Sequence, residues 1–153
     1  MQENSYIQVL IQSLHQKVEA LDSIIEKNQE QYEILSAEEA DMDAFEKNID
    51  EKSQYIDKIV FLDDGFEEIY TRVKEELDGN RAAYTEEIQK MKDLISMITE
   101  RSMKIQVQEQ RNKELAGMQF SKARKKIRQV KAGNKAATQY YNCLLYTSPS
   151  PRD

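Results

Sequence analysis

The chain has 153 residues, 33% of them charged, with no tryptophan and only four glycines. Residues 1–142 contain no proline or cysteine, so nothing there forces a helix to break, and disulfides and thiol catalysis are excluded. The longest apolar runs are three or four residues, too short for a transmembrane helix. The many Glu, Lys, Gln, Ile and Leu residues favour long helices or a coiled coil, so we predict an all-α protein.

Charge is distributed unevenly along the sequence. Residues 1–100 carry 10 Lys or Arg and 25 Asp or Glu, whereas residues 101–142 carry 11 Lys or Arg and only two acids. The whole chain has a net charge of −6. This asymmetry predicts a basic C-terminal helical extension with an acidic partner, either within the molecule or outside it.

A first amphipathic helix is expected at about 5–35. Its apolar residues recur at steps of three and four, the spacing of one helical face. The opening MQENSYIQVL has no basic region followed by an apolar one, so we expect no secretory signal and a cytoplasmic protein. The stripe consists of Ile7, Leu10, Leu14, Val18, Leu21, Ile25, Tyr32 and Leu35.

A second helix is expected at about 38–77, because Ser36-Ala37-Glu38-Glu39 resembles a capping box. Its heptad frame is interrupted only by Lys52 and Asp63. The frame passes unshifted through Gly65, which favours a continuous helix there over a turn or kink. The apolar positions are Met42, Phe45, Ile49, Ile56, Ile59, Phe66, Tyr70, Val73 and Leu77.

A third helix is expected at about 81–142, after the stop signal Leu77-Asp78-Gly79-Asn80, with a break near 117–120 left open. Its stripe begins with apolar residues and becomes small and polar after Ile98. A seam of this kind either packs closely against another helix of the same chain or is a binding surface for a partner protein. Together the patterns predict a single domain, 1–142, built as an elongated antiparallel bundle of three long, coiled-coil-like helices.

The last eleven residues, 143–153, differ from everything before them and hold the only cysteine and both prolines. Their back-translation matches the read-through of a sequencing-library adapter at every residue. We therefore expect this tail to be non-native and without function, and the natural C-terminus to be missing.

Catalytic and metal-binding residues are not evident. The single histidine, His15, is flanked at helical spacing by Ile11 and Glu19, as expected of a surface or seam-edge residue. Paired acids are neighbours in sequence and do not face each other in a helix, and no spacing resembles a metal site. The glycines form no phosphate loop. We expect no enzyme, no cofactor and no metal.

The basic run within FSKARKKIRQVKAGNK could contact nucleic acid or a membrane surface. The acidic net charge of the chain and the lack of interleaved aromatic residues argue against nucleic acid. Phe120, Ile127 and Val130 make only a thin apolar face, which argues against a membrane-surface helix. A solvated face along the acidic body is the simpler interpretation.

Two stretches resemble the FlgN-type flagellar export chaperones of bacteria. In YEILSAEEADMDAFEKNIDEKSQYIDKIVFLDDGFE, a polar break precedes a spaced lysine, Lys52, and an aliphatic run, Ile56, Ile59 and Leu62. In EQRNKELAGMQFSKARKKI, Asn112 and Leu115 match the Asn followed by aliphatic residues of the family's third helix. The resemblance covers nearly all of residues 1–142.

The resemblance implies a cytosolic chaperone that binds the C-terminal helix of hook-associated proteins and presents them to the export apparatus. A FliT-type filament-cap chaperone and a plain coiled-coil scaffold remain alternatives, and the protein could be a monomer or a homodimer. We expect the client to dock on the weak seam of the third helix, assisted by basic neighbours. These client-binding candidates are Ile105, Asn112, Leu115, Gln119, Phe120, Arg111, Lys113, Lys122 and Arg124.

Overall fold

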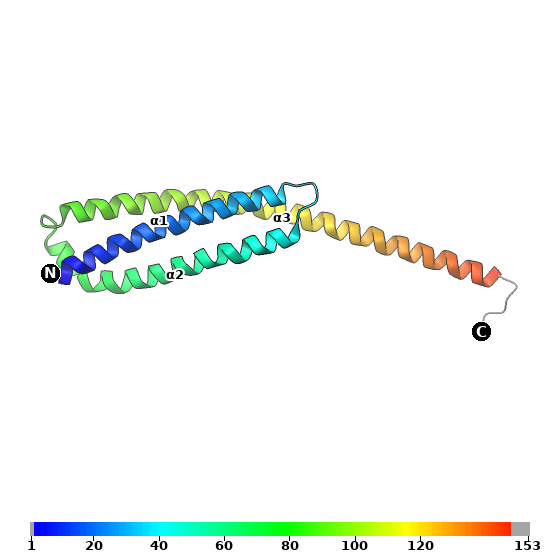
Figure 1. The fold of residues 1–153 in the computed structure, drawn as a ribbon, viewed down its shortest axis with the longest axis horizontal. Helices are drawn as coiled ribbons and strands as arrows, with labels where there is room; N and C mark the ends of the chain where they lie inside the picture. Colours follow the sequence, from blue (N-terminus) through cyan, green and yellow to red (C-terminus); the bar gives the residue numbers. More distant parts are fainter. Residues whose placement is uncertain (1, 148–153) are drawn as a thin grey trace. The chain divides into compact units, whose positions relative to one another are not determined.

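The computed structural model describes the backbone of residues 2–147 and the side chains of residues 5–135. It is 92% helical, and the described residues form three helices without a strand, which confirms the all-α prediction. The helices are α1 (Gln2–Leu35), α2 (Met42–Gly79) and α3 (Thr85–Thr147), shown in Figure 1.

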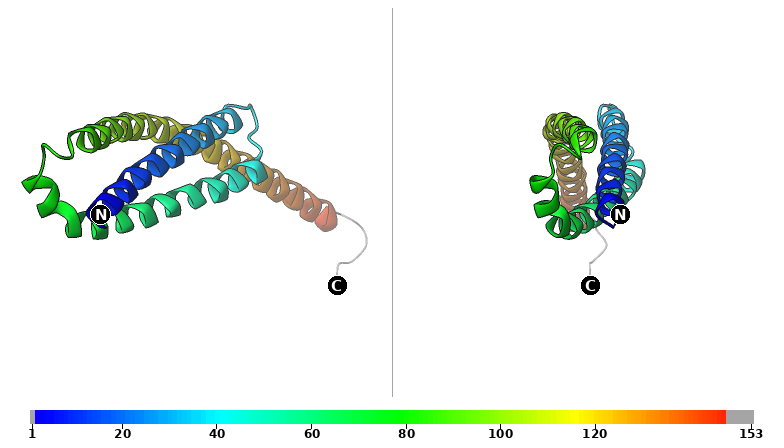
Figure 2. Two further views of the ribbon diagram at one scale, coloured as in Figure 1. Left: turned by 60° about the vertical axis from the view of Figure 1, so that its left-hand side comes forward. Right: turned by 90° about the vertical axis from the view of Figure 1, so that its left-hand side faces the viewer.

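The chain divides into two compact units, residues 1–115 and 116–153. In the first unit, α2 runs antiparallel to α1, and the part of α3 up to residue 115 runs parallel to α1. Figures 1 and 2 show α1 lying beside both of the other helices. The second unit, as far as it is described, is the remainder of α3 from residue 116 to Thr147.

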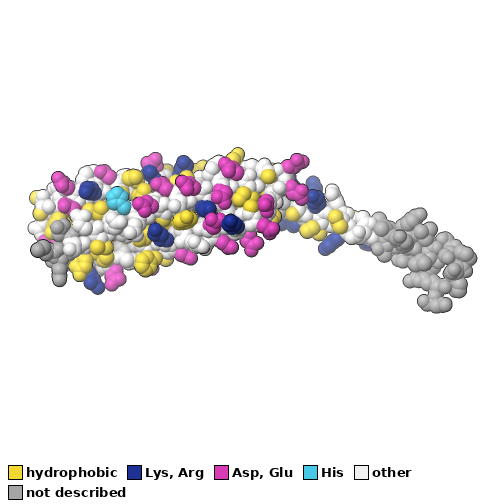
Figure 3. Space-filling model, viewed as in Figure 1, with side chains coloured by type: hydrophobic (Ala, Val, Ile, Leu, Met, Phe, Trp, Pro, Cys, Tyr) yellow, Lys and Arg dark blue, Asp and Glu magenta, His cyan; other side chains and the backbone are white. Residues whose placement is uncertain are grey.

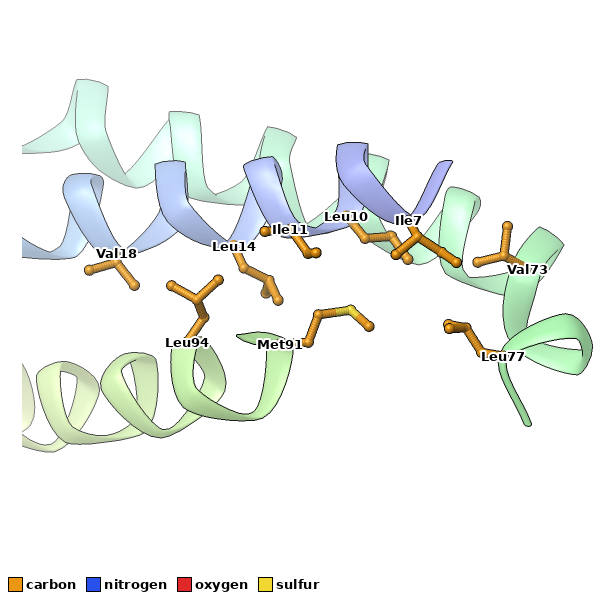
Figure 4. Packing of buried hydrophobic residues seen from close by; sticks show 9 residues of the cluster. All are labelled: Ile7, Leu10, Ile11, Leu14, Val18, Val73, Leu77, Met91 and Leu94. Atoms are coloured by element: carbon orange, nitrogen blue, oxygen red, sulfur yellow. The ribbon is translucent and has the colours of Figure 1, made fainter. Parts of the chain in front are cut away.

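An apolar core fills the end of the bundle that holds the start of α1. Side chains from all three helices point toward one another there (Figure 4). Because each is removed from water, each contributes about 1.5–3 kcal/mol to folding before entropy is counted. The core consists of Ile7, Leu10, Ile11, Leu14, Val18, Val73, Leu77, Met91 and Leu94.

The stripe predicted for α1 is largely confirmed, because Ile7, Leu10, Leu14, Val18, Leu21 and Leu35 are all buried. Polar contacts set the register of α1 against α2. The Ser13 hydroxyl donates to the Leu62 carbonyl at 3.4 Å, and Lys17 Nζ lies 2.8 Å from Asp63 Oδ1. The second contact is solvent-exposed and stabilises the pair by only about 0.2–1 kcal/mol.

The turn between α1 and α2 differs from the sequence prediction. The Ser36 hydroxyl donates to the Tyr32 carbonyl at 2.6 Å and so belongs to the end of α1. The second helix begins at Met42, later than expected, because Asp41 is its N-cap and accepts from the amides of Asp43 and Ala44 at 3.1 Å. The predicted capping box therefore does not form the cap.

The inward face of α2 matches the predicted one near its C-terminal end, where Val73 and Leu77 are buried, but differs from it earlier in the helix. Ile49 and Ile56 are 41% and 45% exposed, whereas their neighbours Asn48 and Lys52 are buried. Farther along, Leu62 is buried where the predicted frame placed Asp63. The predicted stripe is therefore correct at Val73 and Leu77 and wrong at Ile49 and Ile56. Lys52 belongs to the core side of the helix and does not interrupt it.

Helix α3 begins at Thr85, after a turn at residues 80–84. Asn80 caps α2 through its backbone amide, which donates to the Glu76 carbonyl at 3.1 Å. Gly65 lies inside α2 and Gly117 inside α3, and residues 117–120 are helical. The helical assignment extends into the adapter-like tail as far as Thr147, and residues 148–153 of that tail lie outside the described residues.

Candidate functional site

Catalytic chemistry has no evident place among the described side chains. His15 is exposed, as the sequence predicts for a surface residue. Within residues 5–135, no group of three His, Cys, Asp or Glu side chains could hold a metal ion. No helix in the described part of the chain is long and apolar enough to cross a membrane.

A layer of buried polar side chains lies in the other half of the bundle, beyond the apolar core cluster. All three helices contribute two residues each, and every member is 8% exposed or less. Buried amides and amines are tolerated only when they are hydrogen-bonded. We call this set the polar layer: Asn28 and Gln31 from α1, Asn48 and Lys52 from α2, and Gln108 and Asn112 from α3.

Hydrogen bonds join the polar layer across the helices. The Asn28 amide donates to Gln108 Oε1 at 3.3 Å and the Gln31 amide donates to Asn48 Oδ1 at 3.1 Å. Asn112 Nδ2 donates to the Asn28 carbonyl at 2.9 Å and to Gln31 Oε1 at 3.1 Å. Because these bonds need one particular alignment, the polar layer sets the register of the bundle.

Lys52 connects α2 to both other helices. Its Nζ donates to Asn28 Oδ1 at 3.1 Å and to Glu109 Oε1 at 2.8 Å. Nearby, a hydrogen bond from Lys27 to Glu51 raises the pKa of Lys27 above its ordinary value of 10.5. Lys27 therefore remains charged at neutral pH and joins α1 to α2 as a cation.

The structure places the predicted client-binding residues of the first unit mostly against the bundle. Asn112 is only 2% exposed and is occupied by α1, while Ile105 and Leu115 are half-buried and Lys113 is exposed. The Arg111 guanidinium lies 3.8 Å above the centre of the Tyr32 ring, and its Nε and Nη2 are buried without a hydrogen-bond partner. Asn112 therefore packs against another helix of the same chain and is not available to a partner protein.

The predicted residues of the second unit lie on a segment with a different surface. Gln119 is half-buried, whereas Phe120, Lys122 and Arg124 are exposed. Phe120, Ile127 and Val130 recur at helical spacing and are 42%, 54% and 60% exposed. Residues 116–135 contain seven basic residues and no acid. The segment is a basic amphipathic helix, a form suited to pairing with an acidic one.

An apolar groove lies between α1 and α2 and was not predicted from the sequence. Val9, Leu10, Gln12 and Gln16 form its α1 wall, and the α2 wall includes Phe61, Leu62, Gly65 and Phe66. Figure 3 shows hydrophobic side chains on the surface where these two helices lie side by side. One signal was present in the sequence: no Lys, Arg, Asp or Glu occurs between Glu3 and Lys17, in a chain that is 33% charged.

The described residues thus form a three-helix bundle that has an apolar groove between α1 and α2 and a basic amphipathic segment on α3, surfaces of the kind that bind protein partners. The model of the FlgN protein family matches residues 1–142, and the chain belongs to that family. The family is one of flagellar export chaperones and not of enzymes. No curated protein and no solved structure gives a significant match.

Proposed function

We propose that the protein is a cytoplasmic chaperone that binds the C-terminal helix of hook-associated proteins and delivers them to the flagellar export apparatus. The family membership supports the general role of export chaperone. The observation that carries the specific proposal is the basic amphipathic segment of α3, in which Ile127 and Val130 are 54% and 60% exposed. Masking a client's assembly helix requires such a surface, and a client helix with acidic flanks complements it.

The docking surface we propose lies farther along α3 than the one expected from the sequence. Phe120, Ile127 and Val130 supply the apolar contact, and Lys122 and Arg124 supply charge. Leu115 and Gln119 lie earlier on α3 as half-buried members. Asn112 serves the bundle, because its amide is committed to α1.

Titration with C-terminal peptides of hook-associated proteins tests the proposal. The peptides should bind saturably, and Ile127→Asp should weaken binding about tenfold or more, because it puts a carboxylate into the apolar contact. Ile127 is 54% exposed, so the helical content and thermal unfolding of the protein should not change. Val107→Asp, at a position 70% exposed in the first unit, is the matched control and should bind normally.

Charge should act mainly on the association rate. Arg124→Gln should slow association and reduce its salt dependence while leaving the dissociation rate close to that of the parent. Preference for peptides of the filament-cap protein would indicate the FliT-type alternative. Binding of DNA with a steep salt slope and of no peptide would overturn the chaperone proposal, and binding of neither would favour a coiled-coil scaffold.

A further inference from the structure

An apolar stripe on the first part of α2 faces solvent. Ile49, Ile56 and Val60 are 41%, 45% and 55% exposed and recur at steps of seven and four residues, so they share one side of the helix. Met42 continues the series toward the start of α2 and is 42% exposed. At 1.5 Å per residue the stripe extends over about 27 Å, enough to contact several turns of another helix.

A column of acids runs beside the stripe. Its members recur at steps of four and seven residues, so they remain on one flank of the apolar side chains along the whole stripe. All four carboxylates are exposed. We call the apolar stripe and this column together the acidic stripe, and the column consists of Glu46, Asp50, Asp57 and Asp64.

The nearby lysines do not neutralise the acidic stripe. Lys17 and Lys52 each form an ion pair with another acid at 2.8 Å. Lys47 and Lys58 are nine and two positions from Ile56 in the sequence. At about 100° per residue they lie on the opposite side of α2. A partner helix for the acidic stripe must therefore carry apolar residues with basic ones beside them.

The basic segment of α3 has this complementary pattern. Ile127 and Val130 are 54% and 60% exposed, and residues 116–135 contain seven basic residues and no acid. Four of the basic residues recur at steps of four and three on one flank of Ile127, as the acids do on α2. They are Arg124, Arg128, Lys131 and Lys135.

A second copy of the chain fits the acidic stripe better than a client does. The client proposed above has acidic flanks, which the column of acids on α2 repels. Every copy, in contrast, carries a basic amphipathic helix. In a two-fold dimer the contact forms twice, because the basic segment of each copy meets the α2 helix of the other.

We infer that the acidic stripe of α2 is the docking surface for the basic segment of a second copy, and that the free protein associates through this contact. The inference shares the basic segment with the proposed function but not the acidic stripe. A client helix and the α2 helix of a second copy therefore exclude each other from the basic segment, whereas a change in the acidic stripe affects self-association alone.

Sedimentation equilibrium of the whole chain without client tests the inference over roughly 1 µM to 1 mM. A reductant is present because Cys143 is the only cysteine. The parent protein should convert from monomer to dimer. Ile56→Lys and Ile127→Asp should each raise the dissociation constant at least about tenfold, because each removes an apolar contact and puts a like charge opposite the partner's charges. Val107→Lys, at a position 70% exposed, is the matched control and should dimerise normally.

An equimolar mixture of the two variants provides the sharper test. One contact in a mixed dimer retains both parent side chains, and the other places the new lysine opposite the new aspartate. The mixture should therefore associate at least about tenfold more tightly than either variant alone. Circular dichroism and thermal unfolding should show that both variants remain folded, since Ile56 and Ile127 are 45% and 54% exposed.

Client binding separates this inference from the proposed function. Ile56→Lys should bind hook-associated peptides normally while failing to dimerise, and Ile127→Asp should lose both properties. Added salt should weaken the dimer, because screening reduces the attraction between the two surfaces. The inference is wrong if the parent stays monomeric over the whole range, if Ile56→Lys dimerises normally, if the mixture associates no better than its components, or if salt strengthens the dimer. Failure of every peptide to bind would refute the proposed function and leave these results standing.

Discussion

The role of Asn112 in the structure differs from the role predicted from the sequence. Its place in a weak seam suggested a client contact, but its amide bridges the Asn28 carbonyl and Gln31 Oε1 inside the bundle. Its own Oδ1 is buried without a partner. The side chain therefore makes two hydrogen bonds and leaves one acceptor unpaired. This arrangement fixes the alignment of α3 against α1 but does not maximise the stability of the bundle.

Asn112→Asp should destabilise the bundle by about 2–4 kcal/mol, because the carboxylate would face two acceptors with no donor. Asn112→Leu should cost less, about 1–2 kcal/mol, since it removes the unpaired Oδ1 together with the two bonds. Urea unfolding followed by circular dichroism measures both values. Equal stability of Asn112→Asp and the parent protein would show that the side chain is not buried against α1.

The first part of α2 is apolar on more than one face, and this breadth explains why its inward positions there were predicted wrongly, whereas Val73 and Leu77 were predicted correctly. The stripe through Ile49 and Ile56 and the stripe through Asn48, Lys52 and Leu62 lie side by side on the same helix. The second faces inward because α1 and α3 supply partners for Asn48 and Lys52. Hydrophobic periodicity contains no information about those partners, which are distant in sequence.

Leu21→Asp should unfold the bundle or cost more than about 3 kcal/mol, because it places an unpaired charge at a position only 6% exposed. Ile56→Asp should change stability by about 0.5 kcal/mol or less, since Ile56 is 45% exposed. Leu115→Asp should fall between them, because Leu115 is half-buried. Thermal unfolding of the three variants provides the comparison. Equal losses of stability for Leu21→Asp and Ile56→Asp would show that Ile56 is buried in the bundle, as predicted from the sequence.

The molecule as a whole combines an acidic bundle with a basic segment. Residues 1–100 carry a net charge of −15, and residues 116–135 carry seven basic residues without an acid. The basic segment therefore favours an acidic helix as its partner. Added salt should weaken that contact, because screening reduces the attraction between opposite charges.

Removal of residues 143–153 should change neither thermal stability nor peptide binding, because that stretch matches an adapter translation and the family match ends at residue 142. Differential scanning calorimetry and peptide titration of the shortened and full chains measure the two properties. If the shortened chain lost binding or melted several degrees lower, the tail would be a working part of the protein.

Local features of the sequence were enough to predict three long helices, the inward stripe of α1, the continuity of α2 through Gly65 and the charged character of each segment. These follow from the absence of proline, from spacings of three and four, and from composition, all of which act over a few turns of one helix. Which face of the first part of α2 turns inward, whether Asn112 meets a partner or α1, and where an apolar groove forms were decided only by the packed bundle. Each depends on donors, acceptors and space provided by another helix, and those come together only when residues as far apart as Asn28 and Gln108 meet.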